Sequence, residues 1–375
     1  MIHLSGDPNG TQSRTGRVTV PADAVTIDTA LVQRVHDSAP VFDACVPPMG
    51  FWKDPAREIQ SLVDGGFAGV HVTCAPPRHT FTQAVDTIGR LRRLTVEFAD
   101  QLALCRSVAE IEGARAAGRV GVVVHFQEPK PISDDLNRVE TFYELGLRVL
   151  QLTYDVQGWL GTGCAEHTDA GLTHLGGQVV DECNRLGILV DVSHCGWQTA
   201  WDALRRSADP IAITHTGTHA LCPATSRNKP DDLMRAVAES GGMVGICWFS
   251  PMLKRAEGSH EVLPASVEDV LDHVEHAVDV VGPGAVGIGS DLSDLHARTL
   301  EIPAHSSLRH YRNLRPDVYG TGPPDRLVPW PPELNSHAKA RNLTAGLLRR
   351  GYSVADVTGI MGGNWLDLLR RVWRG

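Results

Sequence analysis

The sequence lacks several features that would place it in a special class of protein. It contains no run of about 18 apolar residues, so we expect no membrane-spanning helix. Residues 1–20 are polar and lack the apolar core of a secretory signal, so we expect neither a secretion signal nor an anchor. The net charge of −9 argues against a nucleic-acid partner or an anionic membrane.

Paired cysteines are also missing, because none of the 8 cysteines stands in a CxxC motif. Scattered cysteines in a chain of 375 residues indicate free thiols in a reducing compartment, and we therefore predict a cytoplasmic location. No GxGxxG motif follows the first apolar segment, which weakens the case for a dinucleotide-binding sheet. The sequence shows no internal repeat and no low-complexity tract.

Short apolar segments alternate with amphipathic ones along most of the chain. Apolar residues run almost without interruption in each short segment, which is typical of parallel strands buried on both faces. The predicted strands cover residues 41–45, 69–74, 120–126, 149–153, 188–192, 211–215, 243–248 and 285–290. Apolar residues three and four apart predict helices between them, for example over 135–147 and over 177–186, with Gly187 as C-cap.

Eight strands that alternate with helices predict a (β/α)8 TIM barrel, with a doubly wound open sheet as the main alternative. We expect an N-terminal extension over residues 1–38 and one barrel domain over residues 39–375. The segment 296–337 is rich in His, Pro and Arg, and we expect it to be a long loop over the barrel mouth. Helices are expected after it, at the C-terminus.

Candidate functional residues follow the predicted strands, where the active sites of such barrels lie. His194 and His215 end two successive strands, and Asp291 follows the last one. Imidazoles from adjacent strands can bind one divalent ion, and a nearby carboxylate can accept a proton from water. The alternative is that each histidine is an ordinary hydrogen-bonded residue of the core.

Several longer motifs resemble the membrane (renal) dipeptidase family. They are LVDVSHCGWQTAWDAL, DPIAITHTGTHALCPATSRNKPDDL, AVGIGSDL and the C-terminal NLTAGLLRRGYSVADVTGIMGGNWLDLL. The similarity extends from about the first strand to the C-terminus, and the motifs occur in the family's order. It implies a zinc-dependent hydrolase on a barrel of the amidohydrolase type.

The resemblance also implies roles for individual residues. His194 and His215 match the two histidines that hold one metal of the family's two-metal site. Asp291 matches the aspartate that handles the proton of the attacking water. Arg227 matches the arginine that binds the substrate carboxylate, and Asn228 stands beside it as in the family.

Three positions depart from the family pattern. The first strand of the family ends in His-x-Asp, which binds the other metal, whereas this chain has Cys45-Val46-Pro47. The bridging glutamate aligns with Gln127, and Glu128 follows one place later. A histidine that contacts substrate aligns with Tyr154. One half of the metal site therefore keeps its ligands, while the other has lost most of them.

Cys45 has three interpretations. It could be a thiolate ligand in a Cys/His/His site, with Gln127 as a further candidate ligand and Asp291 as base or fourth ligand. It could be a nucleophile, or it could be a small apolar filler where a metal was lost. We expect one Zn²⁺ per chain, with iron as the alternative.

The predicted function is metal-dependent hydrolysis of an amide or peptide bond in a small, carboxylate-bearing substrate such as a dipeptide. The family tends to dimerise, so the resemblance implies a homodimer. Two alternatives stay open. The barrel could have acquired non-peptidase chemistry as a lyase, dehydratase or cyclase of secondary metabolism, or it could be a non-catalytic binding protein.

Overall fold

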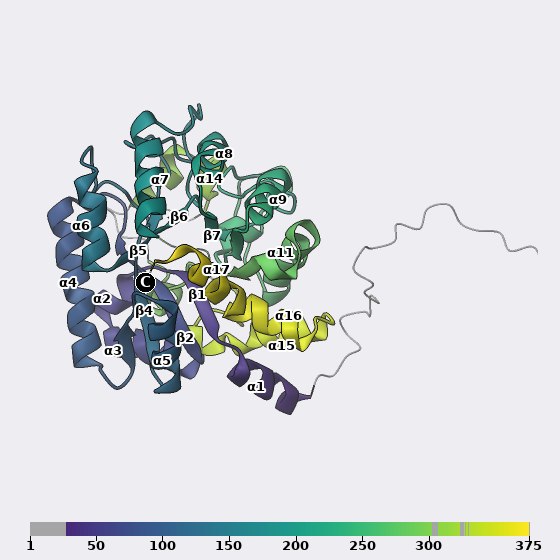
Figure 1. The fold of residues 1–375 in the computed structure, drawn as a ribbon. Helices are drawn as coiled ribbons and strands as arrows, with labels where there is room; N and C mark the ends of the chain where they lie inside the picture. Colours follow the sequence, from purple (N-terminus) through teal and green to yellow (C-terminus); the bar gives the residue numbers. More distant parts are fainter. Residues whose placement is uncertain (1–27, 302–306, 323–325, 327, 329, 375) are drawn as a thin grey trace, which may run out of the picture.

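Parallel strands close into a barrel at the centre of the molecule (Figure 1). The computed structural model describes residues 28–301, 307–322, 326, 328 and 330–374. Within them the barrel runs from β1 through β2, β4, β5, β6, β7, β8 and β9 back to β1. Its bounds are β1 (Val41–Val46), β2 (Phe67–Ala75), β4 (Val120–Phe126), β5 (Leu147–Gln151), β6 (Leu189–Asp191), β7 (Ala212–Thr216), β8 (Met243–Ile246) and β9 (Val286–Ile288). The predicted (β/α)8 barrel is confirmed.

Most strand and helix limits differ from the prediction by one to three residues, and one short strand was not predicted. A short strand, β3 (Leu102–Leu104), pairs with the first half of β4 on the side that β5 joins further along. Helix α6 (Asn137–Leu145) stops before Leu147, where we had expected it to end, because Leu147 already begins β5. Gly146 causes this early end, since it adopts a φ of 114° that favours glycine.

Helices surround the barrel and cover the outer faces of its strands (Figure 1). Helix α7 (His174–Leu186) shows why they form where they do. Thr173 caps its first turn, and Gly187 ends it in the left-handed conformation, as predicted for this glycine. The other helices of eight residues or more are α1 (Thr29–Ser38), α3 (Pro55–Asp64), α4 (Phe81–Glu97), α5 (Val108–Ala116), α8 (Trp197–Arg206), α9 (Asp231–Glu239), α11 (Val267–Val281), α13 (Ser307–Leu314), α15 (Arg341–Arg349) and α17 (Asn364–Val372).

The C-terminal helices close the end of the barrel where the strands begin. α17 packs Trp365 and Leu369 against apolar side chains of the barrel interior, such as Phe42 and Met243. The Trp365 indole donates a hydrogen bond to the carbonyl oxygen of Ile288, 2.9 Å away. Burial of such a large ring stabilises this end, and its removal would cost about 3–5 kcal/mol. The opposite end, where the strands finish, is therefore the end left for a site.

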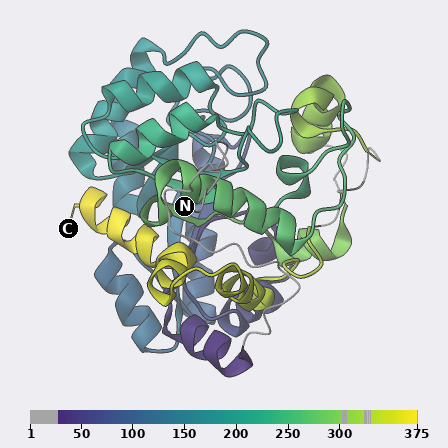
Figure 2. The same ribbon diagram turned by 90° about the vertical axis from the view of Figure 1, so that its right-hand side faces the viewer.

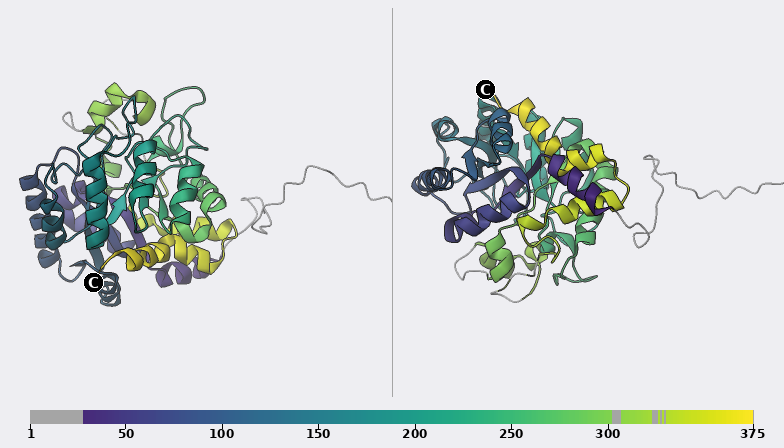
Figure 3. Two further views of the ribbon diagram at one scale, coloured as in Figure 1. Left: turned by 45° about the horizontal axis from the view of Figure 1, so that its top comes forward. Right: turned by 90° about the horizontal axis from the view of Figure 1, so that it is seen from below.

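The segment that we had expected to be a long loop carries short helices over the mouth of the barrel. α13 and α14 (Pro316–Tyr319) lie at the end opposite the C-terminal helices (Figures 2 and 3). Two donors bind the carbonyl oxygen of Val318 in α14, namely the Thr225 hydroxyl at 2.7 Å and the Arg255 guanidinium at 2.5 Å. These bonds attach the segment to the loops that follow β7 and β8.

Residues 1–27 of the expected N-terminal extension lie outside the described residues, and residues 29–38 form α1, which packs against α15. The remaining short helices are α2 (Met49–Lys53), α10 (Ser250–Leu253), α12 (Asp294–Thr299) and α16 (Val354–Thr358). No helix in the described part of the chain is both long and apolar enough to cross a membrane.

Candidate metal centre

Two pairs of neighbouring strands bring four of the predicted residues to one place. β6 and β7 lead to His194 and His215, and β9 and β1 lead to Asp291 and Cys45. The backbone N–H of Asp291 donates to the carbonyl oxygen of Cys45 at 3.1 Å, which joins the second pair at its tip. The ligand atoms of Cys45, His215 and Asp291 all lie within 4.8 Å of one another.

The two histidines face each other through their Nε2 atoms, which are 2.9 Å apart. His194 Nδ1 lies 2.6 Å from Oδ1 of Asp155, and His215 Nδ1 lies 2.8 Å from the Thr214 hydroxyl. Burial raises the pKa of Asp155 to about 7. In its ionised form the carboxylate can only accept, so it holds the proton of His194 on Nδ1 and leaves Nε2 with a lone pair. His194 thus presents Nε2, one of the two ring nitrogens that can bind a metal, toward Nε2 of His215.

The charge state of this pair favours a cation between the rings. Burial, and then the nearby Arg227 guanidinium, lower the pKa of both His194 and His215 well below the usual value. The rings are therefore neutral at physiological pH, and their facing lone pairs repel unless a cation or a shared proton lies between them.

Cys45 and Gln127 form the other half of the centre. Nε2 of Gln127 lies 2.9 Å from Sγ of Cys45 and 3.2 Å from Nε2 of His215. Sγ of Cys45 lies 3.9 Å from Oδ1 of Asp291. Burial and the negative charge of Asp291 raise the pKa of Cys45 well above its usual value, so the thiol needs a cation beside it to ionise.

Asp291 and Tyr154 are two further ionisable residues of the centre. Burial raises the pKa of Asp291 to about 7, so its carboxyl group can exchange a proton near neutral pH. Tyr154 stacks on His194 with ring centroids 4.0 Å apart. Burial, followed by the charges of Asp155 and Asp291, raises the pKa of Tyr154 well above its usual value and keeps its hydroxyl a donor.

Arg227 and Asn228 lie beside the centre and are fully buried. The two Nη atoms of Arg227 donate to the carbonyl oxygens of Ser193 at 2.7 Å and His215 at 2.9 Å, while its Nε has no partner among the described residues. The amide of Asn228 binds backbone groups of the loop after β7 and of α10. In this structure both side chains hold the backbone around the histidines, and Nε of Arg227 is one donor that remains for a substrate.

The sequence did not predict the roles of three aspartates that organise the centre. Asp155 binds His194 directly. Asp43 accepts from the backbone of Cys45 and from Ser290, next to Asp291, and Asp191 does the same for Ser193 and Thr214. A signal was present, because VFDACV and LVDVSH each place one acid in an otherwise apolar strand, where an unpaired charge is costly.

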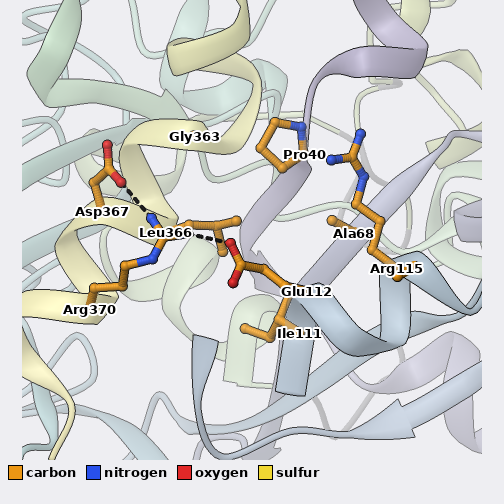
Figure 4. Close-up of a pocket in the computed structure, with 10 residues that line it drawn as sticks. Pro40, Ala68, Ile111, Glu112, Arg115, Gly363, Leu366, Asp367 and Arg370 are labelled. Atoms are coloured by element: carbon orange, nitrogen blue, oxygen red, sulfur yellow. Dashed lines mark hydrogen bonds and ion pairs between the residues drawn. The ribbon is translucent and has the colours of Figure 1, made fainter. Parts of the chain in front are cut away.

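Other candidate side chains lie away from the centre. His71 points into the barrel interior, where Nδ1 contacts the carbonyl oxygen of Ala44, and Cys74 packs in the apolar core. A groove of about 510 Å³ lies at the other end of the barrel, between α5 and α17 (Figure 4). The Arg370 guanidinium in this groove forms ion pairs with Glu112 and Asp367, so its positive charge is already balanced.

The donor set suits a soft or borderline divalent ion. A thiol, two imidazoles and a carboxyl group are the groups that bind Zn²⁺ or ferrous iron in proteins. The facing Nε2 atoms of His194 and His215, with Cys45 and Asp291 close to His215, give the described residues a ligand set that fits such an ion.

Comparison with known proteins assigns the chain to a family. The model of the membrane dipeptidase family (peptidase family M19) matches residues 33–307. The chain belongs to this family. Among solved M19 members, dipeptidase AC superposes with a TM-score of 0.71 at 25% identity and covers 90% of this chain and 99% of that one. The M19 fold and ancestry predicted from the motifs are thus confirmed.

Two further relatives extend the match. An amidohydrolase from Pseudomonas aeruginosa superposes with a TM-score of 0.78 at 28% identity, covering 91% of this chain and 99% of that one. Dipeptidase aclJ from Aspergillus oryzae is 28% identical over 296 residues, which are 78% of this chain and 60% of the relative. As an M19 member the chain is a hydrolase of the metallo-dipeptidase type.

Proposed function

We propose that this M19 protein hydrolyses an amide bond in a small, carboxylate-bearing substrate with a single divalent metal ion. His194, His215 and Cys45 would hold the ion, and Asp291 would serve as base or as a fourth ligand. The observation that carries the proposal is the 2.9 Å approach of the two Nε2 atoms, whose Nδ1 atoms both have other partners.

Zinc is the ion that the donor set favours, and iron is the alternative. Thiolate and imidazole groups are usual ligands of Zn²⁺ in proteins. In this chain the thiolate of Cys45 would stand where the family has ligands of its second ion. When bound, such an ion would polarise the scissile carbonyl and lower the pKa of a water molecule.

The chain's own residues would carry the remaining steps. Asp291, with a pKa of about 7, accepts a proton from the attacking water and can return it to the leaving amine. The Tyr154 hydroxyl, whose pKa is raised well above its usual value, would donate to the oxygen on which charge develops. Nε of the buried Arg227, which has no partner among the described residues, would attract the substrate carboxylate.

The altered half of the centre also favours a second candidate function. Cys45 and Gln127 contact each other where the family pattern has ligands of the second metal, and we infer that this chain does not use the family's two-metal chemistry. The barrel could therefore catalyse a non-peptidase reaction, such as an elimination or cyclisation, with the same single ion.

Elemental analysis of the zinc-reconstituted and iron-reconstituted protein, followed by assay against a broad dipeptide panel, tests the proposal. We expect one ion per chain and cleavage of at least one dipeptide. One bound ion without cleavage of any dipeptide would favour the second candidate. No bound ion after reconstitution would contradict both metal-dependent functions.

Matched variants identify the ligands in the same assay. His194→Ala and His215→Ala should each abolish metal binding, and Cys45→Ser should weaken it. Cys74→Ser is the control for loss of a buried thiol, because Cys74 packs in the core away from the centre. If Cys45→Ser retains full metal content and activity, Cys45 is a filler and the ligand set is wrong.

A further inference from the structure

A buried series of three hydrogen-bonded side chains, His215, Thr214 and Asp191, runs from the centre to the last residue of β6. The Thr214 hydroxyl lies 2.8 Å from Nδ1 of His215 and donates to Oδ2 of Asp191 at 2.6 Å. Asp191 and Thr214 are both completely buried. The proposed hydrolysis does not involve Thr214 or Asp191 directly.

Asp191 fixes the direction of these hydrogen bonds. Its Oδ1 accepts from the Ser193 hydroxyl at 2.5 Å and from the backbone N–H groups of Ser193 and Thr214. Its Oδ2 accepts a hydrogen bond from the Thr214 hydroxyl and lies 3.4 Å from Nε2 of His125. Because an ionised carboxylate only accepts, both hydroxyl protons point toward Asp191.

His215 must then be the donor in its contact with Thr214. The single hydroxyl proton of Thr214 is used on Asp191, so Oγ1 offers only lone pairs to Nδ1 of His215. The proton of the neutral ring lies on Nδ1, and the lone pair of Nε2 faces His194 and the amide nitrogen of Gln127, 3.2 Å away.

The backbone around Thr214 leaves it little freedom to move. A Cβ atom on Gly245 or Gly289 would overlap the carbonyl oxygen of Thr214, so these two glycines let the neighbouring strands close on it. The hydroxyl is thus held between Asp191 and the imidazole.

We propose that Asp191, acting through the Thr214 hydroxyl, is a positioning residue that sets the tautomer of His215 and so makes its Nε2 available to a divalent cation. The part of this inference that concerns a bound cation rests on the proposed function, whereas the part that concerns the tautomer of His215 does not. In His194 the proton is held on Nδ1 by direct contact with Asp155. Partners of this kind typically change metal affinity by about 10–100-fold when they are removed.

Two substitutions at Thr214 test the relay with little change of shape. Thr214→Ser keeps the hydroxyl, and Thr214→Val replaces it with a methyl group of similar size. Asp191→Asn is a second route, because its amide can donate to Thr214 and so turn the hydroxyl proton toward His215. Thermal unfolding checks that each variant is folded.

The first readout is the protonated nitrogen of His215 in the metal-free protein, from ¹⁵N–¹H correlation spectra of the histidine rings. The second is the zinc dissociation constant, from competition with a chromophoric chelator. We expect Nδ1 to carry the proton in the wild type and in Thr214→Ser. In Thr214→Val and Asp191→Asn we expect Nδ1 to lose it and zinc to bind about 10–100-fold more weakly.

The two proposals fail in different ways. If Thr214→Val is folded, keeps the proton on Nδ1 and binds zinc as the wild type does, the relay is refuted. If the wild type binds neither zinc nor iron but Thr214→Val still shifts the proton to Nε2, the proposed function fails and the control of the tautomer stands.

Discussion

Sγ of Cys45 lies 2.9 Å from Nε2 of Gln127, at the tips of β1 and β4. The family pattern places metal ligands at both of these positions, so the contact occupies what would be the second half of a two-metal site. The amide of Gln127 also reaches Nε2 of His215, 3.2 Å away. The half that remains, with its two imidazoles, is the half that can still hold an ion.

The first prediction restores the missing half. The triple variant Cys45→His, Pro47→Asp and Gln127→Glu supplies the three ligands that the family pattern contains. We expect its metal content to rise from one to two ions per chain and its dipeptide hydrolysis to rise by about tenfold or more, because two ions stabilise both the attacking and the leaving groups. Metal analysis and kcat/KM on the same dipeptide measure this.

Pro47→Asp alone is the control, since it adds a carboxylate but leaves Cys45 and Gln127 unchanged. If the triple variant binds two ions but gains no dipeptidase activity, the chain lacks other residues that dipeptide hydrolysis needs besides the metal ligands. A triple variant that still binds one ion would contradict the assignment of these positions.

The second prediction concerns Arg227→Lys. A lysine cannot bind the carbonyl oxygens of Ser193 and His215 with two separate Nη atoms, so one buried acceptor loses its partner. We expect the free energy of unfolding to fall by about 1–3 kcal/mol. Denaturant unfolding measures it, and Arg371→Lys, on the exposed side of α17, is the control. Unchanged stability with a raised KM would show that Arg227 acts only on substrate.

The third prediction separates the ring of Tyr154 from its hydroxyl. Tyr154→Phe keeps the stacking on His194, so we expect stability to stay within about 0.5 kcal/mol and metal content to be unchanged. If the hydroxyl donates to the developing charge, kcat should fall about 100-fold or more. An unchanged kcat would mean that Tyr154 only packs against the imidazole.

The fourth prediction is a pH dependence of stability that arises at His337. Burial alone would lower the pKa of His337, but the carboxylates of Asp294 and Glu58 outweigh it and raise the pKa above its usual value. A raised pKa in the folded state adds stability that is complete below about pH 6.5 and is lost as pH rises through the folded-state value. The lowered pKa of Asp294 adds stability that is lost only in acid.

His337→Gln should therefore destabilise the protein more at about pH 5.5 than at about pH 9. Denaturant unfolding of both proteins at the two pH values measures the difference. Asp43 also faces this imidazole, at 3.8 Å, so the effect belongs to the whole buried cluster. An equal loss of stability at both pH values would show that His337 is neutral in the folded protein.

The barrel strands could be predicted because each is buried on both faces and is therefore apolar throughout. The three-residue strand β3 could not, since so short a run has no periodicity to recognise. The end of α6 was misplaced because Leu147 continues the apolar pattern of the helix past Gly146. Local sequence shows which residues are apolar, but the strand register decides where a strand begins.

The metal-binding candidates could be predicted from their position after a strand, but their partners could not. Nothing near His194 in the sequence shows that Asp155, at the end of another strand, will bind its Nδ1. Arg227 illustrates the same limit, because its motif indicates a substrate contact while the structure uses both Nη atoms on the backbone. Such contacts depend on the register of neighbouring strands, which is fixed only when the barrel forms.

X-ray absorption spectroscopy of the zinc-loaded protein tests the central claim most directly. A single zinc held by Cys45, His194 and His215 predicts one sulfur ligand at about 2.3 Å and nitrogen or oxygen ligands at about 2.0–2.1 Å, with the sulfur signal lost in Cys45→Ser. A spectrum without sulfur, or a zinc–zinc signal from two neighbouring ions, would contradict it.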